Sequence, residues 1–501
     1  MKKKILAMLF VCLFVLVPVL TGCAGGGGDK GKEVLGNPDH PFLPANKDWD
    51  GEVFNVLTKE DRTAAQAFNV VDLVADEENL TDPIQKAVYE RNNKIEAWYN
   101  AKVERQAEAD YQKMANNTDA YGEDFGAYMV SVNDALDLAL KGYVIDYNTA
   151  NYIDLSSEWW DTSAIESLTV KGKVYFALGD INTVDDDATW CVLFNKAIRE
   201  RYKTVLPNFY SAVNDGTWTS DNMKLWASKV VVEGATPDWN TTSNYLYGLY
   251  YQDECATVLL QASGNTPFTW EKNGLVNNNL TKLNVTDSIK TIKNLMEETA
   301  TSAKWAQNIN NISYSGGDVW EKIARGGFMA DKALFFFCHC GTIQLIRSMN
   351  NDFGILPIPK LSETQKEYGN TIQYTNATCY VVPINSADLD FSCFMLDALG
   401  FYSSREHDEE GSQKASYYDI SLQRKASRDD ESWEMLDIVY GNRIFDIACA
   451  MNIETINSYI VTACTTSNQE WSSIIGGVSG AINTQVLENI AILMDPWKPQ
   501  N

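Results

Sequence analysis

Short apolar runs that alternate with helix-like stretches are the feature that most restricts how this chain can fold. The runs that we expect to form strands are residues 52–58, 126–132, 172–178, 190–195, 333–340, 352–358 and 378–384. Strands that are separated by helices predict an α/β fold rather than a sandwich of two antiparallel sheets.

Capping residues mark where helices are expected to begin. Asp82 is expected to cap a helix that has Pro83 at its first position. Ser386 or Asp388 is expected to begin a second helix, and residues 428–432 a third, with Asp or Ser as the cap. The apolar positions of the first helix recur at helical spacing, so we expect that face to pack on a sheet.

The size and charge of the chain limit its class. With 501 residues it is too long for one hydrophobic core, which predicts two or three domains. Its net charge of −26 argues against nucleic acid as a partner, because such binding needs a basic face that displaces counterions. The chain is neither repetitive nor all-β, as a structural surface adhesin usually is.

The cysteine residues do not form a metal-binding pattern. Of the ten cysteines, Cys12 and Cys23 lie near the N-terminus and the other eight are scattered without regular spacing. Cys338, His339 and Cys340 are consecutive, but they lie in an apolar run that is typical of a buried strand. Alternate side chains of a strand face opposite ways, so these three cannot converge on one ion. We therefore expect no metal and no cofactor.

The N-terminal segment is typical of an exported, lipid-anchored protein. Three lysines precede an apolar run over residues 5–19, which is short for a membrane-spanning helix. The sequence Leu-Thr-Gly-Cys that ends at Cys23 resembles the lipobox of bacterial lipoproteins. We therefore expect a signal peptide over residues 1–22, a lipidated Cys23 and a flexible tether over residues 23–47. The protein is then held on the extracytoplasmic face of the bacterial cell membrane by its lipid alone.

Five stretches carry a resemblance to a known family. They begin at residues 82, 172, 192, 352 and 428 and read DPIQKAVYERNNKIEAWYNAKV, GKVYFALGDI, VLFNKAI, DFGILPIPK and RDDESWEMLDIVYGNRIFDI. Together with the lipobox, they resemble the extracellular solute-binding lipoproteins of bacterial ABC importers, of the family 1, carbohydrate-type group. None of the five stretches is a catalytic signature.

The resemblance implies a two-lobed, type II periplasmic-binding-protein-like architecture with hinge-crossing segments and C-terminal helices. One lobe would comprise residues 48–172 plus 357–404, and the other residues 173–356 plus 405–501. A solute would bind in the cleft between the lobes, which agrees with the rule that ligands of open α/β sheets lie beyond the carboxyl ends of strands. The acidic calcium-binding loop of many relatives has no counterpart here, and Gly126 follows Phe125 where relatives carry an acidic residue.

A carbohydrate site should combine aromatic faces with convergent polar groups. The 14 Trp and 24 Tyr residues make a glycan ligand the favoured hypothesis. Positions at the ends of predicted strands, with one of the paired tryptophans, supply the candidates for ligand binding: Asp180, Trp190, Lys59, Glu60, Asp61, Trp159, His339 and Tyr374. His339 has a second interpretation as a buried histidine, and Trp159 and its neighbour Trp160 cannot both face the cleft.

The expected function is therefore capture of a small polar solute, a mono- or oligosaccharide, and its delivery to the permease subunits of an ABC transporter by a monomer. The alternative is a surface-anchored glycan-cleaving enzyme with a carboxylate pair, because the 67 acidic residues supply many pairs. The sequence contains no G-x-S-x-G, H-E-x-x-H or P-loop motif. We therefore expect a binding protein and no catalytic residues.

Overall fold

The structure is a computed structural model of the whole chain. It describes residues 38–494 apart from 62–71, 76, 78–79, 232–236, 241, 243, 271–275, 302–304, 405–407, 409–410, 419–421, 423–428 and 467. The predicted signal peptide and Cys23 lie outside the described residues. Asn37–Asn501 pack as one compact unit.

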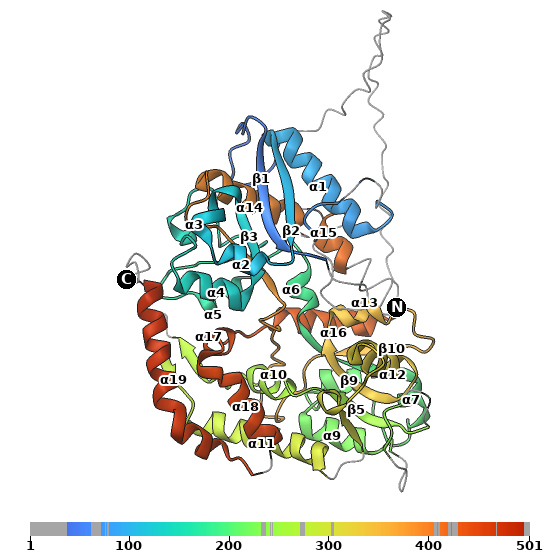
Figure 1. Cartoon of the computed structure of the whole chain (residues 1–501). Coiled ribbons are helices and arrows are strands. Elements are labelled where there is room, and N and C mark those ends of the chain that lie inside the picture. The colour runs from blue at the N-terminus through green and yellow to red at the C-terminus, as the bar shows by residue number, and fades with distance from the viewer. Residues whose placement is uncertain are drawn as a thin grey trace, which may run out of the picture. The chain divides into compact units, whose positions relative to one another are not determined.

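Four strands form the first sheet, in the order β11-β3-β1-β2 (Figure 1). The strands are β1 (Glu52–Lys59), β2 (Ala101–Glu108), β3 (Ala127–Ser131) and β11 (Thr378–Val381). β2 and β3 run parallel to β1, whereas β11 runs antiparallel to β3. Every residue of β3 and β11 is buried, so this half of the sheet is covered on both faces.

Five strands form the second sheet, in the order β10-β4-β9-β5-β8. They are β4 (Trp190–Asn195), β5 (Tyr247–Tyr251), β8 (Ala306–Asn308), β9 (Ala333–His339) and β10 (Phe353–Leu356). β5 runs parallel to β8 and β9, and β4 runs antiparallel to both of its neighbours. The short strands β6 (Phe268–Trp270) and β7 (Val276–Asn278) form a separate hairpin pair.

Most predicted strands are present, and one is wrong. Residues 172–178 form no strand, because their backbone makes only isolated bridges, such as Ala177 with Tyr380. Their apolar side chains pack in the core of a crossing segment rather than in a ladder. Five of the strands were not expected from the sequence: β2, β5, β6, β7 and β8. β2 is polar because it is an edge strand with exposed positions, so it lacks an apolar run.

The three predicted helix starts are confirmed. α1 (Pro83–Tyr99) begins after Asp82, whose side chain accepts from the backbone N–H groups of Ile84 and Gln85. Asp388 caps α14 (Leu389–Ser403), and Asp429 caps α16 (Asp430–Gly441). α1 and α14 pack against each other beside the first sheet (Figure 1).

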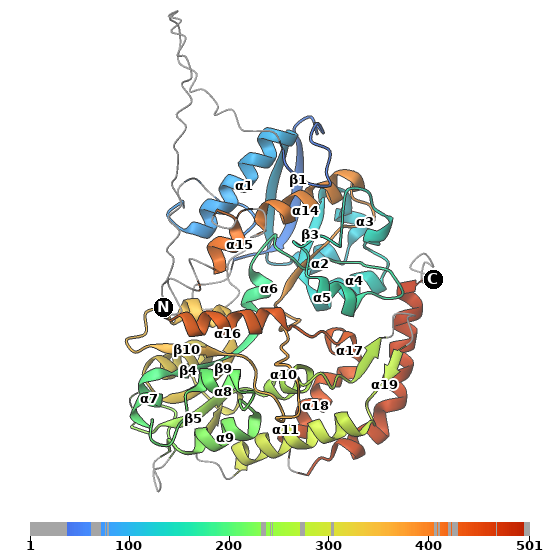
Figure 2. The ribbon, with the colours of Figure 1, turned by 180° about the vertical axis from the view of Figure 1, so that it is seen from behind.

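The remaining α-helices of the described chain are mostly short. They are α2 (Tyr111–Ala115), α3 (Thr118–Tyr121), α4 (Val132–Leu140), α5 (Thr162–Leu168), α6 (Val184–Asp187), α7 (Lys196–Arg201), α8 (Phe209–Asn214), α9 (Ser220–Ser228), α10 (Cys255–Ala262), α11 (Leu283–Thr301), α12 (Gly326–Met329), α13 (Gly341–Leu345), α15 (Gln413–Ala415), α17 (Ile447–Ala450), α18 (Ile456–Thr465) and α19 (Trp471–Met494). The C-terminal helices α18 and α19 pack against α11, and α19 also contacts α4, which follows β3 of the first sheet (Figure 2). Among the residues that are described, no helix has the length and apolar character needed to span a membrane.

The chain crosses between the two sheets in adjacent segments. It leaves the first sheet after β3 and enters the second at β4, and it returns from β10 to β11. The two crossing segments are hydrogen-bonded to each other, from Trp190 N to Thr371 O at 3.1 Å and from Gln373 N to Ala188 O at 2.9 Å. The first crossing ends in β4, which runs antiparallel to β9 and β10. The second crossing ends in β11, which runs antiparallel to β3. The crossings therefore hold the ends of strands from both sheets close together.

This topology gives the α/β, two-lobed fold class that the sequence predicts. All strands of the first sheet lie within residues 48–172 and 357–404, and all strands of the second lie within residues 173–356. The positions of the lobe boundaries stay predictions.

Candidate ligand-binding site

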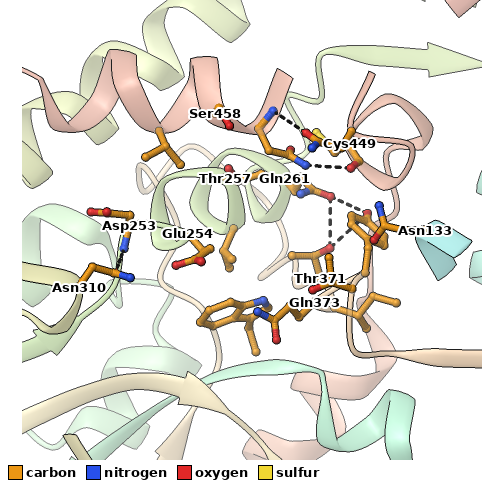
Figure 3. A pocket seen from close by; sticks show the side chains of 18 of the residues that line it. Asn133, Asp253, Glu254, Thr257, Gln261, Asn310, Thr371, Gln373, Cys449 and Ser458 are labelled. Carbon is orange, nitrogen blue, oxygen red and sulfur yellow. Dashed lines mark hydrogen bonds between the residues drawn. The ribbon is translucent and has the colours of Figure 1, made fainter. Parts of the chain in front are cut away.

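A cavity of about 450 Å³ lies where elements that follow strands of both sheets meet (Figure 3). Asn133 enters it from the first turn of α4, directly after β3 of the first sheet. Trp190 enters it from the start of β4 of the second sheet. The remaining walls come from α10, the crossing segment 371–375 and the helices α17 and α18. The volume suits a small solute, because ligand pockets range from about 300 to 1,000 Å³.

One face of α10 forms a long wall of this cavity. Glu254, Thr257, Val258 and Gln261 all line it, at spacings of three or four residues that place them on the same side of a helix. The other side of α10 is packed in the protein interior, which holds these four side chains on the cavity side of the helix. The sequence before α10 is the aromatic strand β5, and Asp253 and Glu254 follow its end.

Two consecutive acidic residues, Asp253 and Glu254, line the cavity where α10 begins (Figure 3). The Asp253 Oδ1 atom accepts from Asn308 Nδ2 at 2.7 Å, and the Asp253 backbone N–H donates to Asn310 Oδ1 at 2.8 Å. Glu254 is exposed to solvent through the cavity, yet the surrounding protein desolvates its carboxylate. That desolvation, with the negative charge of Asp253 as a smaller cause, raises the pKa of Glu254.

A network of amide and hydroxyl groups joins the α10 wall to the crossing segment. Tyr374 Oη donates to Gln261 Oε1 at 2.7 Å, and Thr371 Oγ1 donates to the same atom at 3.2 Å. The backbone N–H of Asp446 donates to Tyr374 Oη at 3.0 Å. Burial raises the pKa of Tyr374, so this phenol stays protonated and remains a donor. The network links the crossing segment to α10 and fixes the Gln261 amide.

Three buried polar atoms of lining residues have no hydrogen-bond partner among the residues that the structure describes. They are Thr257 Oγ1, Asn133 Oδ1 and Asn457 Oδ1. Most buried polar atoms in proteins are paired, so three such atoms around one cavity mark it as a place where a polar ligand can bind. Thr257 is only 8% exposed, which makes its lone hydroxyl costly unless a solute pairs with it.

Two of the eight predicted ligand-binding residues line this cavity. They are Trp190 and Tyr374. Trp190 is 1% exposed, because its indole packs on His339 with ring centroids 3.9 Å apart and on Phe337 at 6.0 Å. The cavity therefore meets only a small part of the indole. Ligand contact by either residue stays a prediction.

His339 lies behind Trp190 rather than in the cavity wall. The two residues are direct partners in the antiparallel pairing of β4 with β9. Burial lowers the pKa of His339 to about 3, so the imidazole is neutral at physiological pH. His339 is partly buried, and its ring packs on the indole of Trp190, so this position fits the interpretation of a structural histidine that supports an aromatic neighbour.

The other predicted residues lie outside this cavity. Trp159 is buried, and its indole donates to Asp397 Oδ1 at 3.3 Å. Lys59 is buried at the end of β1, whereas Glu60 and Asp61 are exposed in the loop that follows. Asp61 pairs with Arg105 at 3.0 Å.

Asp180 belongs to a buried charge network of the crossing region, which we call the hinge network. It consists of Asp161, Asp180, Asp185, Asp186, Lys414 and Arg443. Arg443 lies 2.7 Å from Asp161 and 3.3 Å from each of Asp185 and Asp186. Lys414 pairs with Asp186 and lies 3.5 Å from Asp180.

The hinge network holds more carboxylates than cations. Burial, together with the neighbouring Asp186, raises the pKa of Asp185 to about 7. Burial alone would lower the pKa of Lys414, but the surrounding aspartates raise it, so this ammonium stays charged. Asp187, the next residue of α6, accepts from Tyr417 Oη at 2.7 Å, and burial raises its pKa to about 7 as well. Asp185 and Asp187 owe their raised pKa values to burial in the protein, and neither residue lines the cavity.

The sequence contains a signal for the α10 wall, although its residues were not predicted. Asp253 and Glu254 directly follow β5, and polar residues after a parallel strand are expected near a ligand site. β5 was not expected as a strand, so Asp253 and Glu254 were not among the predicted residues. Asn133 follows a strand that was expected, and the same rule would have found it. The contributions of α17 and α18 have no comparable local signal.

No group of three or more His, Cys, Asp or Glu side chains is arranged to hold a metal ion within the described ranges. Cys338 and Cys340 are both buried in the second sheet region with free thiols. The predicted lipidation residue, Cys23, lies outside the described residues.

The protein has two mixed sheets, adjacent crossing segments and a cavity between elements that follow strands of both sheets, which define a two-lobed α/β fold. No family model matches the sequence, and no curated protein matches it. Solved structures do match. An ABC substrate-binding protein from Listeria monocytogenes in complex with cycloalternan has 13% identity and a TM-score of 0.54, covering 87% of this chain and 99% of its own.

Two further structures are similar over the same extent. A sugar transporter from Rhizobium etli in an open conformation has 16% identity and a TM-score of 0.56, with 86% of this chain and 99% of that chain covered. A cyclo/maltodextrin-binding protein complexed with maltotetraose has 12% identity and a TM-score of 0.53, with 89% and 98% covered. The fold that the sequence resemblance implied, that of ABC transporter solute-binding proteins, is therefore confirmed.

Proposed function

We propose that this protein is a lipid-anchored extracytoplasmic solute-binding protein that captures a mono- or oligosaccharide between its lobes and delivers it to an ABC permease. The observation that carries the proposal is the cavity, lined by many amide, hydroxyl and carboxylate side chains, whose walls come from elements that follow strands of both sheets. The proteins of similar fold support it, because their structures contain cycloalternan, maltotetraose or α-D-tagatose. The proteins named with these ligands are binding proteins rather than enzymes.

The cavity supports a binding mechanism without chemistry. A solute that contacts Asn133 on one side and α10 on the other bridges elements of both lobes. Contacts that exist only when both walls are engaged stabilise the closed arrangement relative to the open one. The crossing segment 371–375 lines the same cavity, so closure and ligand contact share residues.

Thermal unfolding and tryptophan emission of the purified protein test this proposal. A panel of neutral and amino-bearing mono- and oligosaccharides should yield at least one saturable stabilisation, which reaches about 2.7 kcal/mol at a ligand concentration of 100 Kd. Thr257→Val should weaken that binding about tenfold, because it removes the hydroxyl and keeps the shape. Thr364→Val is the matched control, since Thr364 is exposed and does not line the cavity.

A flat response across the panel would contradict solute binding, and release of products from an oligosaccharide would favour the enzyme hypothesis. The anchor is tested separately. Cys23→Ser should abolish labelling by a radioactive fatty acid and release the protein from the membrane fraction. Persistent labelling of that variant would contradict the predicted anchor.

A further inference from the structure

The charges around the cavity are of one sign. Asp253 and Glu254 line it, and no Lys, Arg or His is among the described residues that do so. Neither carboxylate forms an ion pair with a residue in the described part of the chain. Asp253 has one neutral partner, the Asn308 amide, which leaves its charge uncompensated. Two adjacent negative charges in a partly desolvated wall attract a cation and repel an anion.

A second observation points to the same place. The Thr257 hydroxyl lies one turn further along α10, on the face that carries Glu254. Thr257 is 8% exposed, and its Oγ1 atom has no hydrogen-bond partner among the described residues. Figure 3 shows Asp253, Glu254 and Thr257 along one wall of the cavity. A polar ligand group that reaches the two carboxylates can also bond this hydroxyl.

Two of the asparagines that line the cavity, Asn133 and Asn457, are fixed as acceptors. The Asn457 amide nitrogen donates to Cys449 O at 2.9 Å, and the Asn133 amide nitrogen donates to Ala450 O. A carbonyl oxygen can only accept, so each amide must turn its nitrogen toward that carbonyl and leave its oxygen without a partner. The solute therefore needs N–H or O–H donors on this side too.

An ammonium group fits these acceptors better than a hydroxyl. It offers three N–H donors and no acceptor, and it carries the charge that the two carboxylates lack. A hydroxyl can donate only one hydrogen bond and leaves both negative charges in place. The raised pKa of Glu254 agrees, because it reports that the carboxylate lies in surroundings that disfavour its charge.

We infer that the cavity selects a sugar that carries a protonated primary amine, with the ammonium group held by Asp253, Glu254 and Thr257. The inference rests on the proposed function, because it names the class of solute that the same cavity takes. It makes this site a cation-selective one that discriminates against neutral and anionic sugars of the same shape.

Matched probes test the inference by calorimetric titration of the purified protein. Glucosamine and its β-1,4-linked disaccharide carry the amine, glucose and cellobiose replace it by hydroxyl, and glucuronate carries a negative charge. We expect the amino sugar to bind at least tenfold more tightly than its neutral counterpart, and glucuronate not to bind. Spermidine is included as a cation without a sugar ring.

Glu254→Gln separates charge recognition from a structural role. It keeps the size of the side chain, and it should bring the affinity ratio of amino to neutral sugar close to one. Glu363→Gln is the control with the same change in net charge, since Glu363 is exposed and does not line the cavity. It should leave the ratio unchanged. An equal loss for both sugars in Glu254→Gln would mean a structural role and would overturn the inference.

The outcomes distinguish this inference from the proposed function. Neutral sugars that bind as tightly as amino sugars would overturn the inference and leave carbohydrate capture standing. Binding of spermidine in preference to every sugar would support a cation site and overturn the assignment of a sugar ring. No response to any probe would contradict the inference and the proposed function together.

Discussion

The hinge network and the α10 wall of the cavity both contain neighbouring acidic residues. They differ in whether cationic side chains pair with the negative charge. In the hinge network, Lys414 and Arg443 pair with the aspartates. The excess acid keeps its proton more readily, because burial raises the pKa of Asp185 to about 7. In the cavity, Asp253 and Glu254 have no cation among the described lining residues.

This difference distinguishes carboxylates that stabilise the fold from carboxylates that are available to bind a ligand. A buried carboxylate with no counter-charge is costly, so a structural cluster brings its own cations or retains protons. A carboxylate that a ligand will meet can stay uncompensated only where solvent reaches it. Glu254 satisfies that condition, because it is exposed through the cavity.

Removing a cation from the hinge network should have the largest effect on stability. Lys414→Met leaves Asp186 and Asp180 without their ammonium partner in a region where Lys414 is 3% exposed. We expect the free energy of unfolding to fall by about 3–5 kcal/mol, measured by urea denaturation. The double variant with Asp186→Asn should recover part of this loss. A drop below about 1 kcal/mol would mean that the network does not depend on its lysine.

The second largest effect should be a change in stability with pH that comes from the acidic residues of α6. The pKa of Asp187 is raised from 3.8 to about 7, mainly by burial, so the folded state holds this proton more tightly than the unfolded state does. Stability should therefore rise as the pH falls through about 7, and the gain should be complete below about 4. The slope is at most about 1.4 kcal/mol per pH unit for one group.

Asp187→Asn isolates this contribution, because the amide oxygen can still accept from Tyr417 Oη. The difference in unfolding free energy between wild type and variant should change between pH 4 and 7 and be constant below that window. A difference that is independent of pH would show that Asp187 ionises normally in the folded protein.

The smallest expected effect on stability is that of a substitution at Glu254, in the wall of the cavity. Glu254→Gln should raise the unfolding free energy of the ligand-free protein slightly, by about 0.5 kcal/mol or less, since it removes repulsion from Asp253 at a solvent-exposed site. Thermal unfolding at neutral pH measures it, with Glu363→Gln as the reference. A clear destabilisation by Glu254→Gln would place this residue with the structural acids and remove the contrast.

Local features of the fold were predictable, and their limits have physical causes. The strands β1, β4 and β9 and the caps Asp82 and Asp388 follow from patterns within a few residues. Residues 172–178 have the apolar character of a strand, but no neighbouring backbone runs along them over their full length. An apolar run predicts that a segment is buried. Whether the segment also pairs in a sheet depends on segments elsewhere in the chain.

The candidate site was predictable only in part. Trp190 and Tyr374 were expected, because strand ends and crossing segments meet at the cleft of such folds. Asp180 looked equally suitable in the sequence, yet Lys414, more than 200 residues away, engages it in the structure. A charged residue at a strand end can serve a ligand or a distant counter-ion, and the sequence does not distinguish these uses.

The sequence by itself determined the strand and helix starts, the α/β class and the resemblance to solute-binding proteins, because hydrophobic period and capping act over short distances. Only the tertiary structure decided which polar groups share one cavity. Asn133, Glu254 and Asn457 come from three separate helical regions, and the crossing chain brings them together. Whether a side chain keeps an unpaired charge or acceptor depends on those long-range neighbours, so the chemistry of the site appears only in the folded chain.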